Sequence, residues 1–226
     1  MPHARPLPPV SAVVFDFDGT LVETNIDFAG IRARLREHFV ANDCWDEGFF
    51  QRYILEMIDN VCARLDGPRA GEVRREAMEI VHQGEAAACR EGEPYPGVTE
   101  ALQELEKRGY RLGIFTRNSR PCCELVLRRY RLPHTVLLTR DDVENVKPNP
   151  EHLQKTLARL GVRPEWALVV GDHHTDVETA VACGAHAVGV LTTNGTRERF
   201  LECGARLVLD SAAELPDVLP LKAGDR

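Results

Sequence analysis

Two aspartates one residue apart, Asp16 and Asp18, end a short apolar run near the start of the 226-residue chain. The run before them, residues 13–15, is β-prone and apolar on both alternating faces, which predicts a buried strand of a parallel sheet. Gly19 follows the pair and lets backbone N–H groups approach a ligand closely. Because open α/β sheets bind ligands at the carboxyl ends of their strands, these carboxylates lie where chemistry is expected.

Further polar residues follow the later strands that the sequence predicts. Thr116 ends the second strand, Lys147 lies in the loop after the third, and Asp172 and Asp176 follow the fourth. Parallel strands bring all of these ends to one edge of the sheet. With Asp16 and Asp18 included, we expect that edge to hold four carboxylates, one hydroxyl and one ammonium.

Carboxylates in such numbers repel one another unless a cation lies among them. A hard divalent ion resolves that repulsion, and Mg²⁺ explains why the groups are Asp rather than His or Cys. A phosphate completes the site, because the metal, Lys147, Thr116 and loop N–H groups can all bind its oxygens. Asp16 then faces phosphorus as a nucleophile. Asp18 can protonate the leaving oxygen and later accept a proton from the hydrolytic water.

The elements that must position these residues alternate between strands and helices from residue 94 onward. Helices are predicted over residues 97–109, 121–130, 151–160, 176–183 and 197–203, and strands over 111–116, 135–138, 167–170, 187–190 and 206–209. Such alternation predicts right-handed crossovers, and therefore an α/β fold with a doubly wound, parallel, Rossmann-like sheet. The first strand belongs to the same sheet.

Between the first strand and this alternating part, apolar residues recur at helical spacing with no convincing strand among them. Three helical faces are predicted, marked by Ile31, Leu35 and Phe39, by Phe49, Tyr53, Met57 and Val61, and by Val73, Ala77, Ile80 and Val81. Polar stretches at residues 42–46 and 66–71 predict the breaks between these helices. We therefore expect an inserted all-helical cap domain over residues 23–93, and a core formed by residues 1–22 and 94–226.

Composition narrows the classes of partner. The formal net charge of -7 argues against nucleic acid, because binding to a phosphate backbone needs a surplus of Lys and Arg. Seven cysteines without a Cys-x-x-Cys pair fit neither a disulfide framework nor a zinc ribbon. No apolar stretch suits a signal peptide or a bilayer span, so we expect a cytoplasmic protein without a membrane partner. The sequence does not indicate an oligomeric state.

Four segments resemble the four motifs of the haloacid dehalogenase-like (HAD) superfamily. They are residues 16–20, Thr116, Lys147 with Pro148, and residues 171–176. The helical insertion after the first motif resembles the C1-type cap of the phosphoglycolate phosphatase and β-phosphoglucomutase group. The resemblance covers essentially the whole chain.

This resemblance implies a role for each matching residue. Asp16 would be the nucleophile and a metal ligand, Asp18 the acid/base and a metal ligand through its backbone carbonyl, and Asp172 a metal ligand. Asp176 would hold the metal's waters. Thr116 would bind phosphate, and Lys147 would bridge the nucleophile and the phosphate.

The chain also departs from the family pattern. His173 stands where the family commonly has serine, and His174 follows it. Zinc is disfavoured, because adjacent residues rarely ligate one ion together and no third soft ligand has suitable spacing. We expect His173 to lie just outside the metal's ligands and to make activity respond to pH. Arg117 and Asn118 follow Thr116 and are predicted to contact the phosphorylated substrate, although a solvated loop arginine is an equally good interpretation of Arg117.

The chemistry and the resemblance favour a Mg²⁺-dependent phosphatase acting on a small, phosphoglycolate-like phosphorylated metabolite, with the cap excluding water. A phosphomutase of the β-phosphoglucomutase type would use the same core and is the nearest alternative. A non-catalytic phosphate-binding regulatory protein is a further alternative from another class. The sequence does not identify the substrate.

Overall fold

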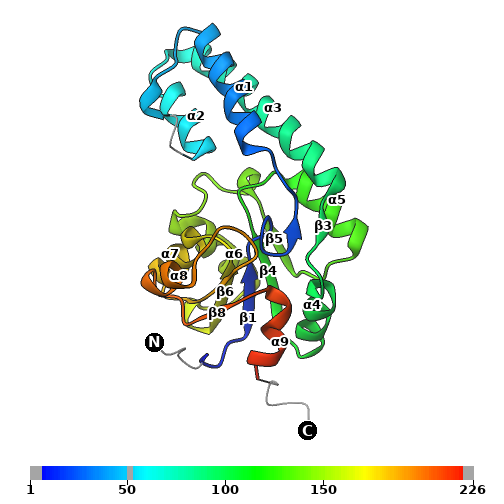
Figure 1. Ribbon diagram of the computed structural model, residues 1–226. Coiled ribbons are helices and arrows are strands. Elements are labelled where there is room, and N and C mark those ends of the chain that lie inside the picture. Colours follow the sequence, from blue (N-terminus) through cyan, green and yellow to red (C-terminus); the bar gives the residue numbers. More distant parts are fainter. Residues whose placement is uncertain (1–6, 50–52, 221–226) are drawn as a thin grey trace. The chain divides into compact units, whose positions relative to one another are not determined.

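The computed structural model describes residues 7–49 and 53–220. The chain forms two compact units (Figure 1). Met1–Thr24 together with Gly92–Arg226 make up the first, the core unit, and Asn25–Glu91 make up the second, the helical unit. The predicted domain boundaries, with a cap over residues 23–93, remain a prediction.

The core unit is built on a six-stranded sheet with the strand order β5-β4-β1-β6-β7-β8. The strands are β1 (Ala12–Phe15), β4 (Arg111–Phe115), β5 (Val136–Leu138), β6 (Ala167–Gly171), β7 (His186–Val190) and β8 (Leu207–Leu209). All five neighbouring pairs are parallel. This sheet confirms the predicted α/β class.

Strand β1 lies at the centre of the sheet, and its four residues are all buried. Its Val14 is in register with Gly113 of β4 on one side and Val169 of β6 on the other. Burial on both faces explains why the strand is apolar at every position instead of alternating. Asp16 directly follows this apolar run, so a buried central strand carries the first carboxylate.

Helices cover both faces of the sheet (Figure 1). They are α4 (Val98–Lys107), α5 (Arg120–Tyr130), α6 (Pro150–Leu160), α7 (His174–Ala182), α8 (Arg197–Glu202) and α9 (Leu215–Val218). Helix α6 buries Leu153, Leu157 and Leu160 against the sheet at i, i+4 and i+7. Each such side chain contributes roughly 1.5–3 kcal/mol through burial. Gly161 ends α6 with φ +65°, a left-handed conformation that glycine adopts without strain.

The helical unit contains α1 (Phe28–Ala41), the short 3-10 helix η1 (Glu47–Phe49), α2 (Ile54–Cys62) and α3 (Gly67–Glu91). These helices enclose an apolar core of their own. Its buried members include Ile31, Leu35, Phe39, Met57, Val61, Val73, Ala77 and Val81, as their helical spacing predicts. The side chain of Phe49 lies outside the described part of the structure.

One local prediction in this region was wrong. The expected break over residues 66–71 is occupied by the start of α3, which begins at Gly67. Pro68 is favourable in a first helical turn, and the carbonyl of Asp66 accepts the N–H groups of Arg69 and Ala70 at 3.1 and 3.3 Å. Polar residues therefore begin the helix there and do not interrupt it.

No helix in the described ranges is long and apolar enough to cross a membrane.

A second, two-stranded sheet in the core unit was not predicted. Its strands, β2 (Val22–Glu23) and β3 (Glu93–Pro94), pair antiparallel. Each strand is too short to show an alternating pattern in the sequence. The sheet is therefore recognised only from the pairing of its two strands in the structure.

Candidate active site

A buried lysine lies between two carboxylates at the carboxyl edge of the core sheet. The Lys147 Nζ lies 2.5 Å from Asp16 Oδ1 and 2.7 Å from Asp176 Oδ1. The side chain of Lys147 is only 2% exposed, so these ion pairs form away from water. The same ammonium lies 4.5 Å from the centroid of the Phe115 ring, within the range of a cation–π contact. Three of the predicted site residues are thus brought into direct contact.

Asp176 reaches this lysine from the first turn of α7. Its Oδ2 accepts the N–H of His173 at 3.2 Å, forming the return half of a capping box. Its Oδ1 is left to pair with Lys147. A Cβ on Gly171 would overlap the Asp176 side chain, which explains a glycine at the end of β6. One oxygen of the Asp176 carboxylate therefore caps α7, and the other forms the ion pair with Lys147.

Asp172 is held by two threonine hydroxyls. Thr20 Oγ1 donates to Asp172 Oδ1 at 3.0 Å, and Thr193 Oγ1 donates to Asp172 Oδ2 at 2.6 Å. Burial, together with the charges of Asp16 and Asp176, raises the pKa of Asp172 from 3.8 to about 7. Burial and nearby like charges both shift a carboxyl pKa in this direction, and a bound cation would oppose the shift.

Lys147 supplies part of the balancing charge. Burial alone would lower the pKa of Lys147, but the charges of Asp16 and Asp176 outweigh it and raise the pKa above its usual value. The ammonium therefore stays protonated across the physiological range. Burial nevertheless raises the pKa of Asp16. The charge of Lys147 therefore does not outweigh the effect of burial on Asp16.

The donor set suits a hard divalent cation. Carboxylate oxygens of Asp16, Asp172 and Asp176 all lie within 4.8 Å of one another, and all three residues are buried. Oxygen-only donors with excess negative charge match the preference of Mg²⁺. The carboxylate of Asp18 is not a member of this group, so its predicted role as a ligand rests on its backbone carbonyl. The predicted ligand assignments remain predictions.

Asp18 has a different set of partners. Asn118 Nδ2 donates to its two oxygens at 3.0 and 3.1 Å, and Thr24 Oγ1 donates to Oδ1 at 2.8 Å. Thr116 Oγ1 lies farther away, at 3.4 Å from Oδ2. The Asn118 amide is oriented by its own Oδ1, which accepts the N–H of Ser119 at 2.7 Å. Asn118, predicted to contact substrate, thus also orients the proposed acid/base.

His173 and Arg117 lie near this cluster. His173 caps α7, accepting the N–H of Thr175 at Nδ1 at 3.3 Å, and its ring centroid lies 4.0 Å from that of His174. Burial, then the nearby charges of His174, Arg117 and Lys147, lower the pKa of His173 to about 4. The neutral imidazole therefore dominates at pH 7. The predicted effect of His173 on activity remains a prediction.

Several residues at the site were not predicted. Thr24 and Thr193 bind the carboxylates of Asp18 and Asp172, and neither belongs to a readable motif. Thr193 follows β7, and the strand-end rule that selected the other residues could have found it there. Tyr95 follows β3; burial and the charges of nearby carboxylates raise its pKa to about 12.

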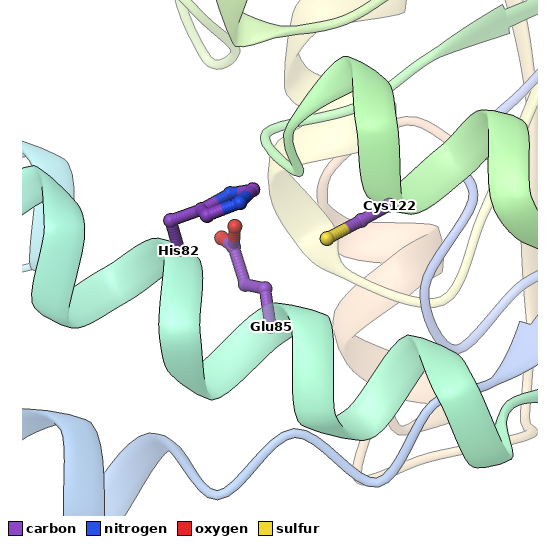
Figure 2. A group of neighbouring side chains, drawn as sticks. All are labelled: His82, Glu85 and Cys122. Carbon is purple, nitrogen blue, oxygen red and sulfur yellow. The ribbon is translucent and has the colours of Figure 1, made fainter.

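His82 and Glu85 lie three residues apart on α3 and project from the same side of that helix, whereas Cys122 lies near the start of α5 (Figure 2). The first two residues belong to the helical unit and the third to the core unit. We assign no site to them.

Comparison with known sequences identifies the family. The sequence model of the family described as haloacid dehalogenase-like hydrolase matches residues 13–190, which include every predicted site residue. The chain belongs to the haloacid dehalogenase-like hydrolase family. This result confirms both the predicted family and the prediction that the protein is an enzyme.

Individual relatives span nearly the whole chain. The pyrophosphatase PpaX of Bacillus mycoides (strain KBAB4) is 32% identical over 212 residues, covering 93% of this chain and 97% of the relative. A crystal structure of CbbY from Rhodobacter sphaeroides in complex with phosphate is 28% identical, with a TM-score of 0.64 and coverage of 91% and 96%. A hydrolase from Pseudomonas syringae, 22% identical, shares the fold with a TM-score of 0.72 over 92% of this chain and 96% of that one.

Proposed function

We propose that the protein is a Mg²⁺-dependent phosphatase that hydrolyses a small phosphorylated metabolite through an aspartyl-phosphate on Asp16. The observation that carries the proposal is the buried Lys147 ammonium held between Asp16 and Asp176. A cation held beside a nucleophilic carboxylate can stabilise the negative charge on the phosphoryl oxygens during transfer. It does so without moving, because it is already in position. Membership of the hydrolase family supports this interpretation.

The proposed reaction has two steps. In the first, a carboxylate oxygen of Asp16 forms a bond to phosphorus while the bond to the leaving oxygen breaks, and Asp18 gives that oxygen a proton. In the second, water attacks phosphorus, Asp18 takes its proton, and the bond to Asp16 breaks to release inorganic phosphate. Asp16, Asp172 and the backbone carbonyl of Asp18 would hold Mg²⁺, and Asp176 would hold the waters of the ion, which would supply positive charge beside the phosphoryl oxygens.

The other residues would orient the reacting groups. Because Lys147 pairs with Asp16 Oδ1, we propose that Oδ2 makes the attack. Asn118 and Thr24 would hold the Asp18 carboxylate in one orientation through both steps. Thr116 and Arg117 would bind phosphate oxygens, since both follow β4 at the same sheet edge.

Two substrate classes merit a direct comparison. Resemblance to the phosphoglycolate phosphatase group suggests a small phosphate monoester. The relative at 32% identity, named as a pyrophosphatase, suggests inorganic pyrophosphate. Both present a terminal phosphoryl group that Asp16 could accept, and they differ in the leaving oxygen.

The test measures phosphate release from phosphoglycolate, pyrophosphate and hexose phosphates, with Mg²⁺ or with EDTA. We expect Asp16→Asn to lower turnover by at least about a thousandfold, because the nucleophile is lost. Asp217→Asn, the same change at an exposed position of α9, should leave turnover unaltered. Full activity in Asp16→Asn or in EDTA contradicts the mechanism. Isomerisation of a hexose phosphate without phosphate release would indicate the phosphomutase instead.

A further inference from the structure

His152 is a fully buried polar side chain in the first turn of α6. Its Nδ1 lies 3.4 Å from the backbone N of Lys147, and its Nε2 lies 3.2 Å from the carbonyl oxygen of Leu138. Five residues after the lysine, the chain thus turns back to bind the lysine's own backbone. No motif of the sequence indicated this contact.

These partners fix the form of the imidazole. An N–H group can only donate, so Nδ1 must accept from Lys147; a carbonyl can only accept, so Nε2 must carry the proton. Only the neutral Nε2–H tautomer satisfies both. Burial, reinforced by the charge of Lys147, lowers the pKa of His152 to about 4, which agrees with a neutral ring.

The second partner joins this histidine to the phosphate-binding strand end. The Leu138 carbonyl also accepts the N–H of Thr116 at 3.0 Å. The His152 ring packs edge-on against Phe115 with centroids 5.5 Å apart, and the Lys147 ammonium lies 4.5 Å from the centroid of the same Phe115 ring. Two neighbouring side chains therefore contact Lys147: His152 binds its backbone, and the Phe115 ring that packs against His152 contacts its ammonium.

We propose that His152 is a positioning residue that holds the Lys147 backbone through Nδ1, so that the ammonium lies between Asp16 and Asp176. This inference rests on the proposed function, because it concerns how Lys147 serves the phosphoryl transfer. A lysine side chain has many rotamers, and its ammonium contacts both carboxylates only when its backbone is fixed at the right depth. Small displacements of reacting groups are costly, since about 1 Å can lower a rate a hundredfold.

Two substitutions separate the two nitrogens of His152. In His152→Asn the amide oxygen can take the place of Nδ1 and still accept from Lys147. In His152→Gln the amide nitrogen can take the place of Nε2 and still donate to Leu138, but the acceptor for Lys147 is lost. Thr156→Val, a buried change on the same helix, serves as the matched control, because it removes a hydroxyl bond to the His152 carbonyl (2.8 Å) and leaves both imidazole nitrogens with their partners.

Two measurements are made on each protein: kcat for phosphate release, and hydrogen exchange of the Lys147 amide by NMR. We expect His152→Gln to lower kcat at least about tenfold and to lose protection of the Lys147 amide. We expect His152→Asn to lower kcat by less than about threefold and to keep that protection. Thr156→Val should resemble the wild type in both measurements.

Equal losses of kcat in the Asn and Gln variants, or a protected Lys147 amide in His152→Gln, would overturn the positioning role and leave His152 as a core residue. The exchange measurement does not depend on turnover. A wild type that releases no phosphate, with the exchange pattern as expected, would therefore contradict the proposed function and uphold the contact between His152 and Lys147.

Discussion

The buried imidazole of His152 should make the core unit sensitive to mild acid. Its ordinary pKa of 6.5 falls to about 4 in the folded protein, because burial and the nearby Lys147 charge penalise the protonated form. The unfolded chain therefore takes up a proton more readily than the folded one. Above the pKa that the imidazole has in the unfolded chain, the imidazole is neutral in both states and no stability is lost. Stability falls as the pH drops through the window from 6.5 to about 4, and no further below it.

The size of the effect follows from the same two values. The difference between 6.5 and about 4 corresponds to a full loss of about 3 kcal/mol, at roughly 1.36 kcal/mol per pKa unit. At about pH 7.5 the imidazole is neutral in nearly all chains, whereas at about pH 5 it is protonated in most of the unfolded chains and in few of the folded ones. The expected loss over that interval is about 2 kcal/mol.

Other groups titrate in the same range, so the comparison must isolate His152. The raised pKa of Asp172, about 7, acts in the opposite direction, since its folded form binds the proton more readily. The free energy of unfolding is therefore measured in urea for wild type and His152→Asn, both in EDTA. A Trp45→Phe background leaves Trp166 as the fluorescent probe, so the signal reports the core unit.

His152→Asn is expected to be less stable than wild type at about pH 7.5, and the gap should shrink by about 2 kcal/mol at about pH 5. Thr156→Val, which does not titrate, should show a gap that is constant with pH. A constant gap for His152→Asn as well would refute the reasoning, because it would mean that the imidazole is protonated equally in both states.

Two further predictions concern the carboxylates. Asp172→Asn should raise the Tm of the EDTA-treated protein by several degrees at about pH 8 while abolishing activity. The pKa of Asp172 is about 7 in the folded protein and 3.8 ordinarily, so ionising this carboxyl in the folded protein costs up to about 4 kcal/mol. The variant avoids that cost. Calorimetry at about pH 8 and about pH 4 checks it, since the advantage should vanish at the lower pH. Gly171→Ala should lower both Tm and kcat, because the added Cβ overlaps the Asp176 side chain and displaces its carboxylate from Lys147. The control is Gly204→Ala, at another glycine of the core unit, which should lower Tm alone.

The strand ends of the core could be predicted because the signal is local. An apolar run that ends in a polar residue marks both a buried strand and the start of its loop, as at Asp16, Thr116 and Asp172. Parallel topology then brings the ends together without knowledge of any contact. The six-stranded sheet agrees with that logic.

The groups that orient the predicted residues could not be found in this way. Thr20 and Asp172 are separated by 152 positions, and Asn118 and Asp18 by 100. Such hydrogen bonds depend on how the loops cross the sheet edge, for which a single sequence has no periodic signal. The same holds for His152, whose spacing on α6 is that of an ordinary core residue.

The two aspartates of the first motif differ in their surroundings more than in their positions. Asp16 pairs with the Lys147 ammonium, whose charge lowers the pKa of Asp16 against the larger, opposing effect of burial. The partners of Asp18 include two neutral donors, the Asn118 amide and the Thr24 hydroxyl, which orient its carboxylate. The proposed nucleophile thus lies beside a fixed positive charge, and hydrogen bonds from neutral groups orient the proposed proton carrier. That difference is the physical basis on which the proposed roles of nucleophile and proton carrier are divided between them.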